Sequence, residues 1–363
     1  MRRFTELSWS WRSTRSRVLS VAAGALVSIA AASMVSAVQA GVVNLGSFSG
    51  EFVTVGDPGN TADSTGYGAV SQTFDIMKFE FTNQQYVQFL NSVDMAGTNP
   101  NAIYHADMGT AARGGISLDS GAAAGSKYAV KTNMGNKPVN YVSWFDAARV
   151  SNWLHNGATS SSSMETGAYT LNDATSGNAA ALNAGARFFI PSENQWYKAA
   201  YYKGGSTNAG YWAYGTQSDT LPGAVTANST GDGSAGSSGN FANHNRGADW
   251  NAQDGNVTTV GTNGGPSAYG AFDMTGNIRE WNDLDSSSSS LRGLRGGRWQ
   301  IGTDLSSSSR IAFGPQVATS GNDVNGFRLA SLSSDAAVPE PSMMVIGMVF
   351  GLGGLAAKRR LKK

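Results

Sequence analysis

Two carboxylates on either side of a glycine could bind a hard metal ion in residues 270–281. Asp273 and Glu280 flank Gly276, a residue type that adopts backbone conformations other residues resist. Calcium takes about six to eight oxygen ligands from carboxylates, carbonyls and water. We therefore predict calcium at the carboxylates of Asp273 and Glu280, with the backbone oxygens of Gly276 and Ile278 as further ligands.

The same two carboxylates have a structural alternative. Asp273 could hydrogen-bond to its neighbouring backbone in an Asx turn. Glu280 could instead form an ion pair with Arg295 or Arg328. The sequence alone leaves both the metal site and this alternative open.

Other catalytic chemistry has little support in the sequence. The chain has no cysteine and three histidines, at positions 105, 155 and 244, so disulfides, zinc–thiolate sites and thiol nucleophiles are excluded. Glu193 and Asp283 could be a glycosidase pair, but that role depends on their separation, which the sequence does not fix. The simpler interpretation is that Glu193 is a charge at the start of a helix and that Asp283 is a carboxylate in a loop.

Three helices are predicted to position these groups, because each begins with one capping pattern. A polar cap residue is followed three positions later by a side chain that can bond back to it. The pairs are Thr82 with Gln85, Ser143 with Asp146, and Ser192 with Gln195. His155 falls in the last turn of the second helix, where the helix dipole favours a positive charge, so we predict a capping role for it.

Short strands and long loops make up the rest. Strands are predicted at residues 41–56, 74–76, 79–81, 187–190, 295–299 and 326–329. Residues 95–136, 158–185 and 204–265 are rich in Gly, Ala, Ser and Asn and are predicted to be loops. Aromatic residues between positions 201 and 214 argue against simple disorder in the third loop.

Both ends resemble targeting segments. Five arginines precede an uncharged run over residues 18–38, and Val38-Gln39-Ala40 follows, as in a secretory signal peptide spanning residues 1–40. Near the C-terminus, Val-Pro-Glu-Pro precedes an uncharged segment at 343–357 and five basic residues. Residues 338–363 resemble a PEP-CTERM sorting signal with a short transmembrane segment, which an exosortase removes in Gram-negative bacteria that make surface polysaccharide. A lasting tail anchor is the alternative.

The charge of the body between these ends argues against nucleic acid as a partner. Residues 41–337 contain 16 Lys and Arg against 23 Asp and Glu, a net charge of −7 (16 − 23). Nucleic-acid binding needs a basic surface. An acidic body fits an exported protein that binds cations. Signal peptidase and exosortase are the expected partners during export, with transient membrane anchoring by the C-terminal segment.

Six ordered blocks resemble the formylglycine-generating enzyme (sulfatase-modifying factor) family. They are Phe-Glu-Phe-Thr-Asn-Gln-Gln-Tyr at 79–86, Lys-Pro-Val-Asn-Tyr-Val-Ser-Trp at 137–144, Ile-Pro-Ser-Glu-Asn-Gln-Trp at 190–196, residues 270–281, Arg-Gly-Gly-Arg-Trp at 295–299 and Gly-Phe-Arg at 326–328. The resemblance implies an α+β, C-type-lectin-related fold over residues 41–337, with small twisted antiparallel sheets, a few helices and much irregular loop. It also implies calcium at the first site and a second calcium site at Asn243, Asp254 and the backbone of His244 and Asn256.

The reaction that names this family is not expected here. Its copper is held by two enzyme thiols, and Ile301 and Ser306 stand where the resemblance places them. Copper(I) is a soft ion that selects sulfur. We therefore expect no copper, and the sequence favours a protein that is not an enzyme.

Two functions remain open. The first is a calcium-stabilised binding module at the cell surface or in the extracellular matrix, with polysaccharide as ligand and Tyr211, Trp212 and Trp299 on the binding face. Aromatic faces stack on sugars, which supports this prediction. The alternative is an oxidoreductase of the same superfamily that uses another metal in a pocket beneath Trp299.

Overall fold

A computed structural model describes residues 41–284, 289–300 and 316–332. The described residues all lie in one compact unit of the chain. The predicted signal peptide (1–40) and sorting signal (338–363) lie outside the described residues. Within the described ranges no helix is long and apolar enough to cross a membrane.

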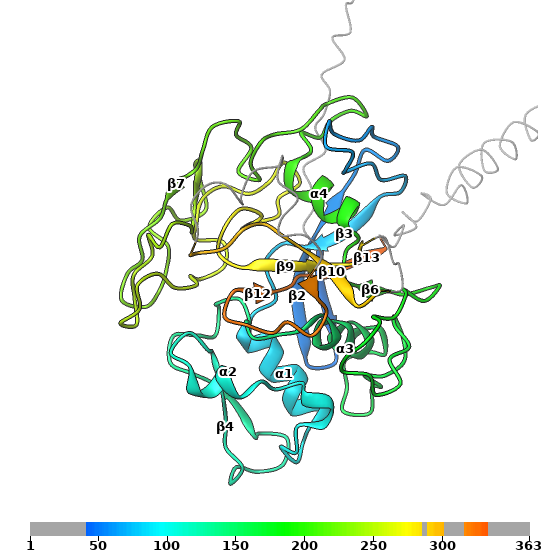
Figure 1. The fold of residues 1–363 in the computed structure, drawn as a ribbon, viewed down its shortest axis with the longest axis vertical. Coiled ribbons are helices and arrows are strands. Elements are labelled where there is room, and N and C mark those ends of the chain that lie inside the picture. Colours follow the sequence, from blue (N-terminus) through cyan, green and yellow to red (C-terminus); the bar gives the residue numbers. More distant parts are fainter. Residues whose placement is uncertain (1–40, 285–288, 301–315, 333–363) are drawn as a thin grey trace, which may run out of the picture. The chain divides into compact units, whose positions relative to one another are not determined.

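An antiparallel sheet of five strands, in the order β1-β2-β3-β13-β6, forms the centre of the described unit (Figure 1). Each neighbouring pair runs antiparallel. Its strands are β1 (Gly41–Leu45), β2 (Phe48–Val55), β3 (Phe74–Met77), β13 (Ala330–Leu332) and β6 (Phe188–Phe189). The sheet therefore joins the beginning of the body to its end.

A second sheet carries the acidic stretch at 270–281. Its order is β11-β10-β9-β12, with β9 and β10 antiparallel and β12 parallel to β9. The strands are β9 (Arg279–Asn282), β10 (Leu291–Arg295), β11 (Gln316–Val317) and β12 (Asn325–Gly326). Two small strand pairs lie outside it: β4 (Ile116–Leu118) with β5 (Tyr128–Val130), and β7 (Gly223–Ala224) with β8 (Phe241–Ala242).

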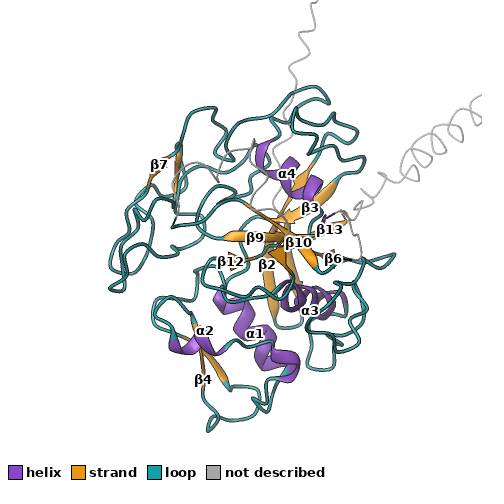
Figure 2. Cartoon of the chain, viewed as in Figure 1, coloured by secondary structure: helices purple, strands orange, loops and turns teal. Residues whose placement is uncertain are grey.

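Three helices confirm the predicted capping patterns: α1 (Asn83–Val93), α3 (Trp144–His155) and α4 (Glu193–Tyr201) (Figure 2). Each has a complete capping box, in which the cap side chain accepts from the third backbone N–H and the third side chain accepts from the cap backbone. Helix α1 lies against β2 and β5, and α3 lies against β6. Most of α3 is buried on every side, so it forms part of the core.

Several local predictions were wrong. Residues 95–136 are not only loop, since they hold η1 (Pro100–Ala102), α2 (Ala106–Thr110) and the hairpin of β4 and β5. Residues 79–81 belong to no named strand, because β3 ends at Met77. His155 does not act as a charged cap: its Nδ1 accepts from the backbone N–H of Arg187 at 3.1 Å, and burial followed by the charge of Arg187 lowers its pKa.

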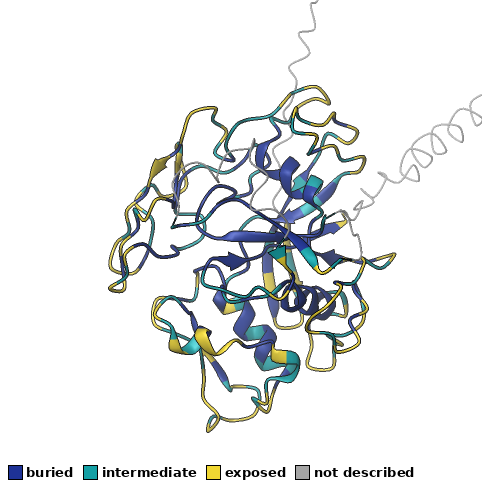
Figure 3. Cartoon of the chain, viewed as in Figure 1, coloured by how far each residue is buried: buried dark blue, intermediate teal, exposed yellow. Residues whose placement is uncertain are grey.

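The hydrophobic core is rich in large aromatic side chains. Trp144, Trp153, Trp196 and Trp281 are each fully buried. Figure 3 shows burial concentrated on the central strands and on α1, α3 and α4, while the tips of the loops are exposed. A smaller cluster around Trp299 includes Met134, Trp250, Val257, Ile278 and Val324. With small antiparallel sheets and few helices, the predicted α+β fold is confirmed.

Candidate functional site

The acidic stretch folds as a tight turn pressed against a neighbouring loop. Asp273, Gly276 and Asn277 all have positive φ, at 58°, 86° and 58°. A Cβ on Gly276 would lie 2.4 Å from the backbone oxygen of Asn243, which is much closer than van der Waals contact. Glycine is therefore required at 276 for two reasons, its backbone conformation and the space around it.

Glu280 forms a buried ion pair with Arg328. The Arg328 guanidinium donates from Nε to Oε2 at 2.6 Å and from Nη2 to Oε1 at 2.7 Å, and both side chains have no exposed surface. The indole Nε1 of Trp196 also donates to Oε2, at 2.8 Å. This is the structural alternative that the sequence left open, with Arg328 and not Arg295 as the partner.

Asp273 and a carboxylate without a predicted role, Glu80, lie near the same arginine. Asp273 accepts from the backbone N–H of Gly261 at 2.6 Å and from the amide of Asn263 at 2.8 Å. Burial raises the pKa of Asp273. Burial, and then the charges of Asp273 and Glu280, hold the pKa of Glu80 well above its usual range. Glu80 lies in one of the family-like blocks, but nothing local in the sequence signalled its burial.

The predicted second calcium set is only partly brought together. Asn243 donates from Nδ2 to the backbone oxygen of Asn256 at 2.8 Å and to Thr258 Oγ1 at 3.0 Å. Its own side-chain oxygen is buried and has no hydrogen-bond partner among the described residues. An unpaired buried oxygen normally requires a water or an ion.

Asp254 and the backbone of His244 have other partners. Asp254 is exposed, and its carboxylate accepts from Arg246 at 2.5 Å. The backbone oxygen of His244 accepts from the N–H of Gly247 at 3.1 Å, while the His244 ring is bonded through Nε2 to the backbone oxygen of Pro222 at 3.0 Å. Calcium at either predicted set stays a prediction.

Glu193 and Asp283 each have an arginine partner. Arg295 donates to Glu193 from Nη2 at 2.7 Å, and Arg292 Nε lies 3.1 Å from Asp283. All four side chains are almost completely buried. Both carboxylates are therefore held in buried ion pairs.

The predicted aromatic binding residues are mostly engaged within the fold. The Tyr211 hydroxyl donates to the backbone oxygen of Thr61 at 2.8 Å. The Lys203 ammonium lies 4.1 Å from the centre of the Trp212 ring, a cation–π contact. Trp299 is 1% exposed. Of the three, Tyr211 and Trp212 retain partial exposure, so ligand binding at these residues stays a prediction.

The sequence profile of the sulfatase-modifying factor enzyme 1-like domain matches residues 29–332, most of the chain. The protein belongs to this family. Its members include formylglycine-generating enzymes, as the ordered blocks indicated. Ile301 and Ser306, at the positions expected for the copper thiols, lie outside the described residues.

Solved structures with a similar fold have low sequence identity. Treponema denticola variable protein 1 has a TM-score of 0.48 and 19% identity, covering 81% of this chain and 99% of its own. CarF has a TM-score of 0.45 and 19% identity, covering 82% and 98%. PvdO from Pseudomonas aeruginosa has a TM-score of 0.40 and 17% identity, covering 80% and 98%. No curated protein matches the sequence significantly.

A cavity of about 380 Å³ at the start of α1 adds a site to this sulfatase-modifying-factor domain that the sequence did not reveal. We name it the amide cleft. It is lined by Ser49, Phe79, Thr82, Gln84, Gln85, Gln88, Asn136, Thr259 and Val260. None of these lining residues carries a charge, and four carry amides. The sequence did contain one signal for this cleft, the three glutamines at positions 84, 85 and 88. From the sequence, this segment was interpreted only as the start of a helix.

Two residues of the amide cleft define its chemistry. The side-chain oxygen of Gln88 is buried without a partner in the described part of the chain, so an incoming donor would satisfy it. Phe79 stacks on Phe272 with ring centres 5.4 Å apart, and a Cβ on Gly261 would lie 2.5 Å from its ring. The ring is therefore held firmly by packing and forms an apolar wall.

Proposed function

We propose that this domain binds an extracellular polysaccharide through the amide cleft and does not carry out copper-dependent oxidation. The observation that carries the proposal is a cleft with neutral amides and hydroxyls beside an apolar ring. Amides both donate and accept hydrogen bonds, as sugar hydroxyls do, and an aromatic ring suits the C–H faces of a sugar. Its volume lies within the range of small-molecule sites, about 300–1,000 Å³.

The chemistry of the chain supports binding over catalysis. The sequence has no cysteine, and copper(I) selects sulfur ligands. The carboxylates of Glu193, Glu280 and Asp283 are each matched by an arginine. A carboxylate held in a buried ion pair is a poor general base, because its lone pairs and its charge are already engaged.

The proposed setting is the outside of a Gram-negative bacterium. Residues 1–40 would direct export and be removed by signal peptidase, and residues 338–363 would anchor the chain until an exosortase acts. Support comes from the basic leader followed by an uncharged run, and from Pro-Glu-Pro before the C-terminal apolar segment. Attachment to surface polymer would agree with a ligand of the same chemistry.

Glycan binding tests the proposal directly. We expect the purified domain to bind a subset of neutral glycans on an array, and Gln88→Leu to weaken that binding about tenfold, because a donor loses its buried acceptor. Phe79→Ala should weaken it as well. Titration calorimetry with the best glycan measures both, and circular dichroism confirms that each variant is folded.

Trp212→Ala is the matched control, since it removes a partly exposed aromatic residue outside the amide cleft. It should bind like the unmodified protein. If Trp212→Ala abolishes binding and Gln88→Leu does not, the aromatic loop is the binding face and the assignment to the cleft is wrong. If no neutral glycan binds the folded protein, polysaccharide binding itself is wrong.

We also propose that calcium stabilises the domain at Asn243 and its neighbours, where a buried side-chain oxygen has no described partner. Adding EDTA should lower the melting temperature by about 5 °C or more, because an ion that binds only the folded state stabilises it. Calcium in excess should restore the value and magnesium should not, since magnesium demands a tighter octahedral site. An unchanged melting temperature in normally folded protein would contradict the proposal.

A further inference from the structure

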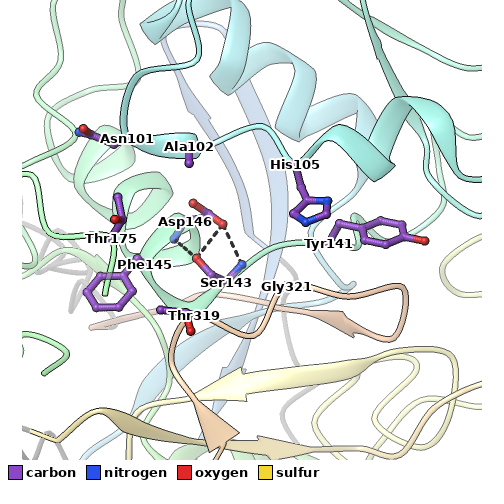
Figure 4. A pocket seen from close by; sticks show the side chains of 10 residues that line it. All are labelled: Asn101, Ala102, His105, Tyr141, Ser143, Phe145, Asp146, Thr175, Thr319 and Gly321. Carbon is purple, nitrogen blue, oxygen red and sulfur yellow. Dashed lines mark hydrogen bonds between the residues drawn. The ribbon is translucent and has the colours of Figure 1, made fainter. Parts of the chain in front are cut away.

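A second cavity, independent of the amide cleft, lies at the beginning of α3 (Figure 4). We name it the α3 pocket. Its volume is about 160 Å³, and its lining includes His105, Tyr141, Ser143, Asp146, Thr175 and Thr319. These residues come from four separate stretches of the chain, so the fold creates the pocket and no single motif does.

Asp146 supplies the chemistry of the α3 pocket. Its Oδ2 accepts from the backbone N–H of Ser143 at 2.8 Å and from the Ser143 hydroxyl at 2.7 Å. No hydrogen bond joins its Oδ1 to a described residue, and Figure 4 draws both bonds on one oxygen only. Asp146 is 7% exposed and lines the pocket. The Oδ1 atom can therefore accept a hydrogen bond from a ligand in the pocket, and a charged donor forms a strong bond to a carboxylate.

Burial disfavours the charged form of the Asp146 carboxylate. It raises the pKa of Asp146 to about 6, although the bonds from Ser143 act in the opposite direction. Arg149, one turn further along α3, does not neutralise it fully, because Arg149 donates to Glu165 at 2.7 Å. Near neutral pH, the negative charge of Asp146 is therefore not fully neutralised by a positive side chain.

The walls of the α3 pocket combine aromatic and polar groups. Tyr141 has a φ of 60°, an uncommon conformation for an aromatic residue. Its ring stacks on His105 with centres 5.5 Å apart. His105 Nδ1 accepts from the backbone N–H of Asp107 at 3.2 Å, which holds the imidazole in place. The hydroxyls of Thr175 and Thr319 complete the lining.

We propose that the α3 pocket binds a primary ammonium group carried on a small polar ligand, with Asp146 as its counter-ion. An ammonium group has three donors, so it can bond to the free Asp146 oxygen and to neighbouring hydroxyls at once. A charged donor also forms stronger bonds to a carboxylate than a neutral one does. The pocket volume of about 160 Å³ suits a group of the size of one sugar or smaller.

The experiment compares ammonium probes with neutral analogues of the same shape. We expect glucosamine and ethanolamine to bind, measured by NMR titration of the whole exported domain, and glucose and ethylene glycol to bind at least about tenfold more weakly. Asp146→Asn should weaken glucosamine binding by about tenfold or more, since its amide keeps the capping acceptor but loses the charge. Asp119→Asn, an exposed acid outside the pocket, is the control and should bind normally.

The pH profile gives a second readout that does not depend on a variant. Binding should weaken from about pH 7.5 to about pH 5, because protonation removes the Asp146 charge. His105 also lines the α3 pocket. The other charged groups around the pocket are Asp107, Arg113, Arg149, Glu165, Asp173 and Asp323.

Three results would overturn the proposal. They are equal binding of glucose and glucosamine, unchanged affinity in a folded Asp146→Asn protein, and no binding of either ammonium probe. Neutral-glycan binding that depends on Gln88 would be unaffected by all three, so this site can fail while the amide cleft stands.

Discussion

Replacing Arg328 by methionine is expected to lower the free energy of unfolding by about 3–5 kcal/mol. Arg328 and Glu280 are completely buried, and the guanidinium donates to both carboxylate oxygens. Without it, the Glu280 charge stays buried and unpaired. Urea unfolding followed by tryptophan fluorescence measures the loss.

Two controls separate the buried pair from a general loss of arginine. Arg246→Met breaks the exposed pair with Asp254 and should cost no more than about 1 kcal/mol. The double variant Arg328→Met with Glu280→Gln should be more stable than Arg328→Met alone, because the unpaired charge is gone. If Arg328→Met costs as little as Arg246→Met, the ion pair is not an important part of the core.

Replacing Gly276 by alanine is expected to cost about 3 kcal/mol or more. The new Cβ would meet the backbone oxygen of Asn243 at 2.4 Å, at a position where φ is 86°. Backbone cannot move aside as easily as a flexible side chain. The turn carrying Asp273 and the loop carrying Asn243 would have to separate, which thermal and urea unfolding would both detect.

Gly157→Ala is the matched comparison for this substitution. Gly157 also has positive φ, at 97°, but no atom lies within 4 Å of where its Cβ would be. Its replacement should cost only the conformational part, about 1 kcal/mol. Equal losses at 157 and 276 would show that the close contact with Asn243 contributes nothing.

Local signals account for what the sequence predicted well. The capping boxes at Thr82, Ser143 and Ser192 involve residues three positions apart, so they are visible without knowing the fold. The ion-pair partner of Glu280, in contrast, could not be predicted from residues close in sequence. Arg295 lies directly opposite Glu280 in the pairing of β9 with β10, yet its guanidinium bonds to Glu193. Only the packing of distant segments decides between the two arginines.

The same limit explains the missed pockets. Asp146 was interpreted as a capping residue, which is correct for one of its oxygens. The other oxygen borders the α3 pocket because residues around His105 and Thr319, far apart in the chain, lie beside it. Gln88 had no predicted role, and its place in the amide cleft depends on residues near 136 and 259 that lie beside α1.

The position of β13 has a consequence for how the chain is made. Residues 330–332 lie between β3 and β6 in the central sheet, so strands from the first half cannot complete their pairing until nearly the whole body has been synthesised. Contacts between such distant segments form slowly. The early strands can pair among themselves, but the sheet is closed only when residues 330–332 insert between β3 and β6, so the last strand acts as the clasp of the folded body.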